Sequence, residues 1–91
     1  MRAKTLTYLI TYDLNRPGQD YGGLTAALTQ AGGVRILLST WLLRSAETSS
    51  QVRDRYWRHL DAADRLWVNE VNSNWACNNV MNSEAAKRLL P

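Results

Sequence analysis

Apolar or aromatic side chains occupy every second position from Leu6 to Tyr12, and Asp13 ends this run. The run is rich in β-branched and aromatic residues and is followed by the turn-forming pair Pro17-Gly18, so it predicts a strand followed by a loop. Successive side chains of a strand point to opposite faces. We therefore expect one face of this strand to join the core through four residues: Leu6, Tyr8, Ile10 and Tyr12. Asp13 should end the strand on the other face.

The spacing of apolar residues then changes to that of a helix. Tyr21, Leu24, Leu28 and Ala31 would form one stripe on a helix over residues 21–31, which Gly32-Gly33 would end. The apolar run 34–44 is too long for one ordinary strand in so small a chain. It predicts two strands with a turn or bulge near Ser39-Thr40.

A second helix and a fourth strand follow. Residues 48–51 have the Thr-x-x-Gln spacing of a capping box, which predicts a helix from there to about Leu60. Val52, Tyr56 and Leu60 would face the core, with His59 beside them as a structural residue. Residues 65–71 predict a strand with Leu66 and Val68 on one face and Trp67 and Val71 on the other.

This order of elements predicts an α+β fold of the ferredoxin-like βαββαβ type, with an antiparallel sheet and both helices on one face. The 91 residues suit one domain, with a core over 1–72 and a tail over 73–91. In the tail we expect an extra strand at 75–77, paired along a sheet edge, and a short helix over 83–90.

Two helices can cover only one face of such a sheet. Leu9, Trp67 and Val71 are expected on the other face, where they would form an apolar surface. A second copy of the chain is the simplest cover for it, so we expect a twofold homodimer.

Composition adds only weak constraints. The chain has 11 basic and 8 acidic residues, and nine of the basic ones are arginine, which binds phosphate groups well; the same residues could also be ordinary solvated charges. No apolar stretch is long enough to cross a membrane. Cys77 is the single cysteine, so an internal disulfide is excluded and a cytoplasmic location is expected.

Three short motifs resemble those of the Cas-two proteins, the small non-integrase subunit of the CRISPR adaptation machinery, and of their standalone SinR-like relatives. They are Tyr12-Asp13 with the following residues to Tyr21, Ser39-Thr40-Trp41-Leu42, and Asp64 to Val68. The resemblance implies a ferredoxin-like protomer and a dimer whose open sheet faces meet. It also implies that Asp13 from both chains holds magnesium for hydrolysis of phosphodiester bonds. The related virulence-associated protein D toxins are ribonucleases on the same fold, which favours RNA over DNA as the nucleic-acid partner; the sequence itself does not decide between the two as substrate.

Asp13 is the leading candidate for a catalytic and metal-binding residue. Magnesium usually keeps several waters and needs only one or two carboxylates besides substrate phosphate, so two Asp13 side chains in a dimer would suffice. The alternative is structural: Asp13 would accept backbone hydrogen bonds from the loop that follows it.

The other candidates are a catalytic helper and possible contacts to a nucleic acid. They are Tyr12 as the helper, and Arg16, Asn15, Ser39, Arg55 and Arg58 as substrate-binding residues. Each has an ordinary structural alternative, as a turn, core or solvated residue. Two further functions also stay open: a non-catalytic dimer that binds nucleic acid or bridges proteins, and a regulatory domain that binds a small ligand.

Overall fold

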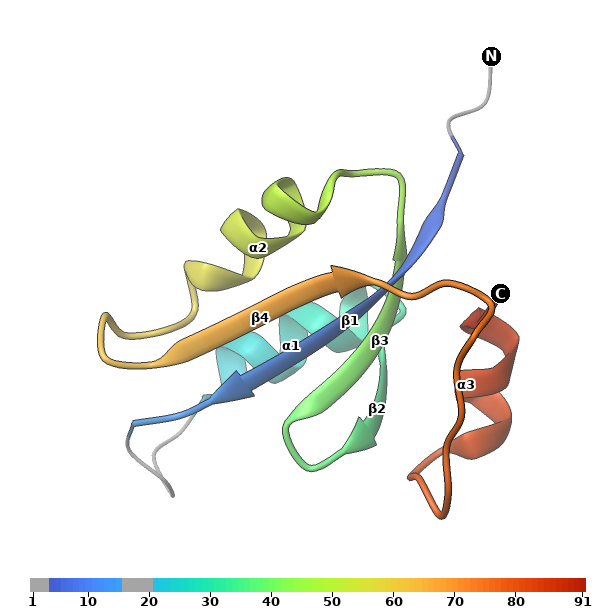
Figure 1. The fold of residues 1–91 in the computed structure, drawn as a ribbon. Coiled ribbons are helices and arrows are strands. Elements are labelled where there is room, and N and C mark those ends of the chain that lie inside the picture. Colours follow the sequence, from blue (N-terminus) through green and yellow to red (C-terminus); the bar gives the residue numbers. More distant parts are fainter. Residues whose placement is uncertain (1–3, 16–20) are drawn as a thin grey trace.

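The computed structural model describes residues 4–15 and 21–91, and these form a small α+β structure (Figure 1). Over this part of the chain, the elements in order are β1 (Leu6–Asp13), α1 (Gly22–Gln30), β2 (Val34–Leu37), β3 (Thr40–Ser45), α2 (Ser49–Trp57), β4 (Arg65–Glu70) and α3 (Ser83–Leu89). The predicted break between the middle strands is confirmed, because a turn at residues 38–39 separates β2 from β3.

The four strands of the described residues form one sheet in the order β2-β3-β1-β4, and all neighbours are antiparallel. In this register Ile10 lies opposite both Trp41 and Val68, and Asp13 lies opposite Arg65. The register shifts between Arg35 and Leu37, where β2 carries an irregularity.

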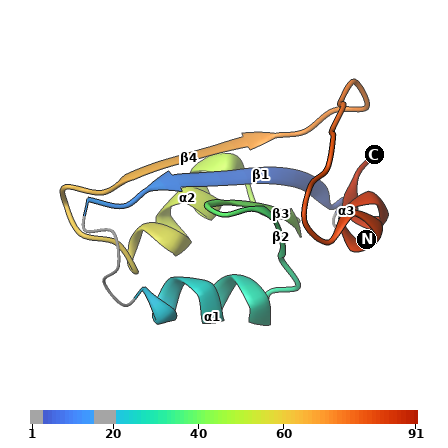
Figure 2. The ribbon, with the colours of Figure 1, turned by 90° about the horizontal axis from the view of Figure 1, so that it is seen from below.

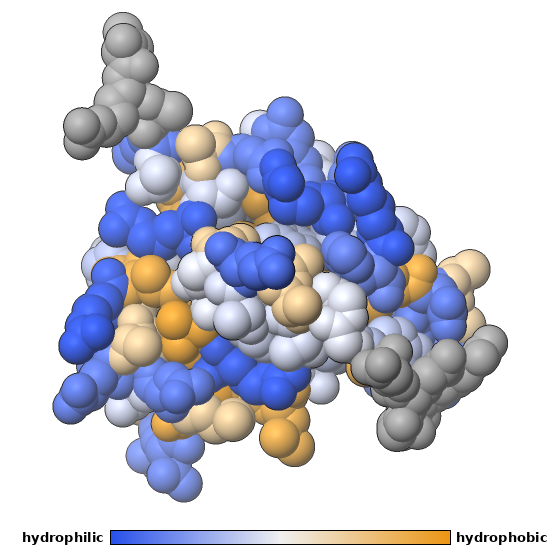
Figure 3. Space-filling view, turned by 180° about the vertical axis from the view of Figure 1, so that it is seen from behind, coloured by the Kyte–Doolittle hydropathy of each residue, from blue (hydrophilic) through white to orange (hydrophobic). Residues whose placement is uncertain are grey.

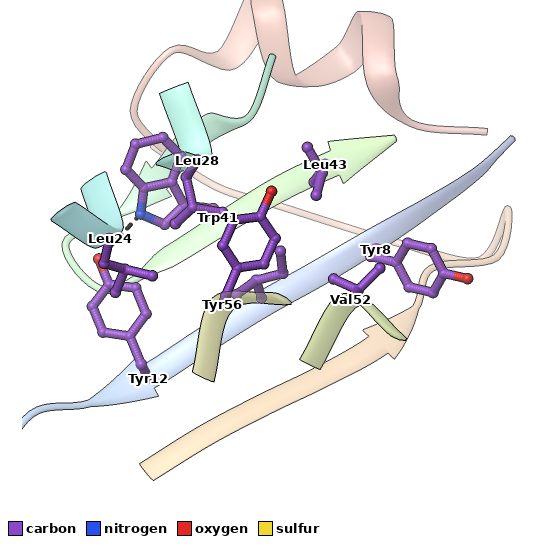
Figure 4. Close-up of a cluster of buried hydrophobic side chains, with 9 residues drawn as sticks. Tyr8, Tyr12, Leu24, Leu28, Trp41, Leu43, Val52 and Tyr56 are labelled. Atoms are coloured by element: carbon purple, nitrogen blue, oxygen red, sulfur yellow. Dashed lines mark hydrogen bonds between the residues drawn. The ribbon is translucent and has the colours of Figure 1, made fainter. Parts of the chain in front are cut away.

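Helices α1 and α2 lie on the same face of the sheet (Figure 2). The core between them and the sheet is a cluster of buried side chains (Figure 4): Tyr8, Ile10, Tyr12, Leu24, Leu28, Trp41, Leu43, Val52 and Tyr56. The predicted inward face of β1 is thus confirmed. The opposite face of the sheet, which α1 and α2 leave uncovered, is called the open face below.

The capping box predicted for α2 is present. The Gln51 N–H donates to Thr48 Oγ1 over 3.2 Å, and the Thr48 N–H donates to Gln51 Oε1 over 2.9 Å. The helix ends at Trp57 rather than near Leu60, because the next residues tighten into a turn in which Leu60 N–H donates to the Trp57 carbonyl. This turn leaves the His59 side chain exposed, so its predicted place on the inward half of the helix is wrong.

The tail after β4 covers one end of the open face. Thr7, near the start of β1, is buried there and donates to the Leu89 carbonyl. A small cavity between tail and sheet is lined by Leu9, Leu42, Val71, Trp75 and Leu90, among others. The expectation that a second copy covers Leu9 and Val71 is therefore wrong, because the chain's own tail lies against them.

The extra strand predicted at 75–77 is absent from the described residues, whereas the predicted short helix is confirmed as α3. The tail cannot run straight along the sheet edge, because Asn79 and Asn82 have positive φ angles of 59° and 50°. It instead binds the edge strand β2 through two hydrogen bonds of 2.9 Å, one from Met81 N–H to the Ile36 carbonyl and one from Asn82 Nδ2 to the Arg35 carbonyl.

The helices of residues 4–15 and 21–91 are too short or too polar to cross a lipid bilayer.

Candidate nucleic-acid interface

A shallow depression lies at the end of the open face that the tail leaves uncovered. It is lined by residues 11–13, where β1 ends, and 65–67, where β4 begins, and has a volume of about 240 Å³. The antiparallel register of β1 and β4 brings these two segments together. We call it the Asp13 depression.

Asp13 is exposed in this depression and pairs with Arg65. Arg65 Nη1 lies 3.3 Å from Asp13 Oδ2, and the two side chains are 82% and 72% exposed. An ion pair this exposed is screened by solvent and contributes little to stability. Both groups are therefore available to a ligand without a large loss of folding energy.

Trp67 is the aromatic residue of the Asp13 depression that faces solvent. Its side chain is 66% exposed, and its Nε1 donates to Asn69 Oδ1 over 3.0 Å. This hydrogen bond restrains the indole, while the ring face remains free to contact a planar group. Neither Arg65 nor Trp67 was singled out as a site residue by the sequence, because only the register of β4 against β1 places them beside Asp13.

Tyr12 is a core residue, and its hydroxyl group does not take part in the group of polar side chains in the Asp13 depression. Its side chain lies on the helix-covered face, where its hydroxyl accepts a hydrogen bond from Trp41 Nε1 over 3.1 Å (Figure 4). Arg35 also approaches this hydroxyl at 3.5 Å and stacks over the Trp41 ring at 5.0 Å. The structure therefore does not bring the Tyr12 hydroxyl to Asp13.

The other loop candidates have structural contacts or cannot be placed. The Asn15 N–H donates to Asp64 Oδ1 over 2.7 Å, and the Ser39 carbonyl accepts from the Tyr12 N–H over 3.1 Å. Both contacts use backbone atoms of the two candidates, which are thus turn residues near the depression. Arg16 lies outside the described residues.

A buried carboxylate that the sequence did not reveal supports these loops. Asp64 is 4% exposed and accepts hydrogen bonds from Asn15 N–H, Tyr21 hydroxyl and Asp61 N–H over 2.7, 3.0 and 2.7 Å. It joins the loop after β1 to the loop before β4. Asp64 lies in the polar loop between α2 and β4, where no hydrophobic periodicity indicates which side chains are buried. Only its three contacts therefore reveal this role.

Arg55 lies on α2 and Arg58 is the C-cap residue directly after it; both are on the helix-covered side of the sheet and do not join Asp13. Arg55 makes two hydrogen bonds of 2.8 Å to the Glu47 carboxylate. These bonds raise the pKa of Arg55 and lower that of Glu47. Arg55 is thus already paired within the chain.

One chain supplies few ligands for a metal ion. Among the described residues, no three His, Cys, Asp or Glu side chains lie close enough together to hold one. The Asp13 depression offers one carboxylate, one guanidinium and one exposed indole, which together suit a phosphate-bearing aromatic ligand.

No known family model matches this chain, and no solved structure matches it significantly.

Proposed function

We propose that the chain forms a homodimer of ferredoxin-like protomers, similar to the Cas-two-like superfamily, that binds RNA and hydrolyses its phosphodiester bonds with magnesium at Asp13. The order of elements from β1 to β4 and the strand order β2-β3-β1-β4 support the ferredoxin-like fold. The observation that carries the function is the grouping of Asp13, Arg65 and Trp67 in one solvent-facing depression.

Each of these three side chains has a distinct role toward a single strand of RNA. Trp67 stacks on a base, since a base offers an aromatic face whatever its sequence. The Arg65 guanidinium binds a backbone phosphate, to which it can donate two parallel hydrogen bonds. Asp13 then faces the same backbone and is the oxygen ligand for a cation bound there.

The Asp13 carboxylate of one protomer supplies only part of the ligand set that magnesium needs. A single carboxylate with substrate phosphate is at the lower end of what magnesium uses, and Arg65 competes for the same oxygen. A second Asp13 from a partner copy would complete the ligand set. When bound, the ion would polarise a phosphoryl oxygen and lower the pKa of a bound water.

The uncovered end of the open face is the surface we assign to the dimer. The strand registers place Leu37, Thr40, Thr11 and Trp67 in one row across the sheet. The two ends of this row are apolar and solvent-facing, with Leu37 50% and Trp67 66% exposed. A second copy that covers the Leu37 side of this row and leaves Trp67 at its rim, open to RNA, would bring its own Asp13 toward the first.

Hydrolysis of single-stranded RNA tests the catalytic proposal. We expect cleavage with magnesium, loss of cleavage with EDTA, and a fall of about 100-fold or more in Asp13→Asn, as is typical when a transition-state contact is lost. Asp54→Asn is the matched control, because Asp54 is an exposed carboxylate on α2 that pairs only with Arg53 in the described chain. Cleavage that is equal in Asp13→Asn and Asp54→Asn would contradict the proposal.

Sedimentation at micromolar concentration tests the dimer. Leu37→Lys places a charge in the row and should produce monomers, whereas Trp57→Lys changes an exposed apolar residue on α2 and should leave the dimer intact. A monomeric wild-type chain would refute the homodimer.

The Asp13–Arg65 ion pair favours one alternative, a dimer that binds nucleic acid or bridges proteins without catalysis. An aspartate already neutralised by arginine can serve to position that arginine for phosphate. Such a protein would bind RNA equally well in EDTA, and Asp13→Ala would weaken binding only modestly while Arg65→Ala would abolish it.

A further inference from the structure

A second concave surface lies on the helix-covered side of the molecule, between α1 and α2. This groove has a volume of about 420 Å³ and is lined by Ala27, Gln30, Ala31, Arg55, Tyr56, Arg58 and His59. It is separated from the Asp13 depression by the sheet. Figure 3 views this side and shows strongly hydrophilic surface over α2.

The charges in the groove are positive and incompletely paired. Arg55 is bound to Glu47, but within the described residues no hydrogen bond or ion pair engages the Arg58 guanidinium or the His59 ring. None of the lining residues is acidic. The groove therefore offers hydrogen-bond donors to an anion without supplying a competing carboxylate.

The lining also keeps the groove open. Ala27 and Ala31 have no atoms beyond Cβ, and Gln30 adds a neutral amide beside the cations. An arginine donates two parallel hydrogen bonds to a phosphate, and a neighbouring histidine can donate a third.

We propose that this groove binds the phosphate group of a small molecule, such as a nucleoside monophosphate, through Arg58 and His59. The adjoining surface along α2 decides between a compact ligand and a nucleic-acid backbone. That surface shares Arg55 and Arg58 but is also lined by Glu47 and Asp54. Their carboxylates would repel the next phosphates of a polyanion, whereas one phosphate group in the groove avoids them.

Calorimetric titration of the full chain with adenosine monophosphate and with inorganic phosphate tests this site. Arg58→Gln should weaken binding of both about tenfold, because it removes the charge and the bidentate donor. Ala31→Glu should do the same by placing a carboxylate in the groove. Arg53→Gln is the matched control: Arg53 lies on α2 outside the groove and is paired with Asp54, so we expect a change of less than about twofold.

The two probes also show which part of the ligand is recognised. Equal affinities would mean that the groove binds phosphate alone, and tighter binding of the nucleotide would mean that it also contacts the nucleoside; both support the site. The proposal is overturned if neither probe binds at millimolar concentration, or if Arg58→Gln behaves like Arg53→Gln. Arg58-dependent binding of single-stranded RNA that is tighter than that of the nucleotide would also overturn it.

This site does not depend on the proposed hydrolysis. Asp13→Asn should abolish cleavage and leave phosphate affinity in the groove unchanged, because the two sites lie on opposite sides of the sheet. Failure of one proposal is thus distinguishable from failure of the other.

Discussion

A buried carboxylate joins the two loops that flank Asp13. Asp64 accepts hydrogen bonds from one hydroxyl and two backbone N–H groups, and these donors belong to segments on either side of the depression. Hydrogen bonds to a charged acceptor are worth about 1.5–3 kcal/mol each. Asp64 therefore stabilises the geometry around Asp13 although it faces no ligand.

Replacing Asp64 by alanine should lower the free energy of unfolding by about 3 kcal/mol, because buried donors lose their acceptor. Asp64→Asn should cost less, since its amide oxygen still accepts from one side. Urea unfolding followed by tryptophan fluorescence measures both. Asp61→Ala is the control, because it removes an exposed side chain while keeping the backbone N–H that Asp64 binds; an equal loss in this variant would argue against the assignment.

Tyr12 should behave as a core residue. Tyr12→Phe removes the acceptor of the Trp41 indole N–H, which should cost about 1–2 kcal/mol of stability. It should leave magnesium and RNA binding unchanged, because the hydroxyl lies on the other face of the sheet from Asp13. A stable Tyr12→Phe protein with lost cleavage would instead show that the hydroxyl acts in catalysis.

At the level of elements, the start of α2 is held by more than its capping box. Glu47 immediately precedes the N-cap residue Thr48, and its carboxylate binds Arg55 at the other end of the helix. Its carbonyl accepts a hydrogen bond from the buried Tyr8 hydroxyl. The ion pair thus links the helix to the connection from β3.

This pair makes stability depend on acid pH. The Arg55 hydrogen bonds hold the pKa of Glu47 below its ordinary value of 4.5, so below that pH the unfolded chain binds the proton more readily than the folded chain. The stabilisation is complete above pH 4.5 and is lost as the pH falls through the lower folded-state pKa. Urea midpoints measured from pH 6 to pH 3 should fall, and less steeply in Glu47→Gln than in the wild type.

The control for this effect is Asp54→Asn. Asp54 and Arg53 form an ion pair in which both side chains are more than half exposed, so the pair contributes little. The variant should keep the wild-type pH dependence. If the urea midpoint of Glu47→Gln depended on pH as steeply as that of the wild type, the Glu47–Arg55 ion pair would not be the cause of the dependence.

For the molecule as a whole, the tail covers one end of the open face. Leu42 is only 3% exposed although it points away from α1 and α2, and Leu90 and Trp75 lie in the cavity next to it. Burial of such side chains supplies the energy that holds the tail in place.

Leu90→Asp should therefore destabilise the protein by about 2–3 kcal/mol, because it brings a charge against Leu9 and Leu42. Lys87→Ala, on the exposed side of α3, should change stability by less than about 0.5 kcal/mol. Urea unfolding gives both values, and binding of a hydrophobic dye should rise only in Leu90→Asp. Equal stabilities would mean that the tail packs weakly on the sheet.

Local patterns predicted much of the fold. The alternation in β1, the Thr48–Gln51 capping box and the break between β2 and β3 each depend on residues only a few positions apart, and the structure contains all three. The site was predicted less well. Asp13 stands where expected, but its neighbour Arg65 is 52 residues away, and the pairing follows from the register of two strands. In the Asn-rich tail the strand predicted at 75–77 does not form, although the short helix does. So short a segment is compatible with both an extended and a turning backbone, and its sequence alone does not decide between them.

The sequence by itself thus determined the strands β1 to β4, the helices α1 and α2, and which face of β1 joins the core, because periodicity and capping act between near neighbours. Only the tertiary structure decided which charges meet, which carboxylate is buried and what covers the open face. All three features depend on packing between segments far apart in the chain, and no local sequence pattern predicts that packing. The same packing sets the Asp13 depression and the groove between α1 and α2 on opposite sides of one sheet.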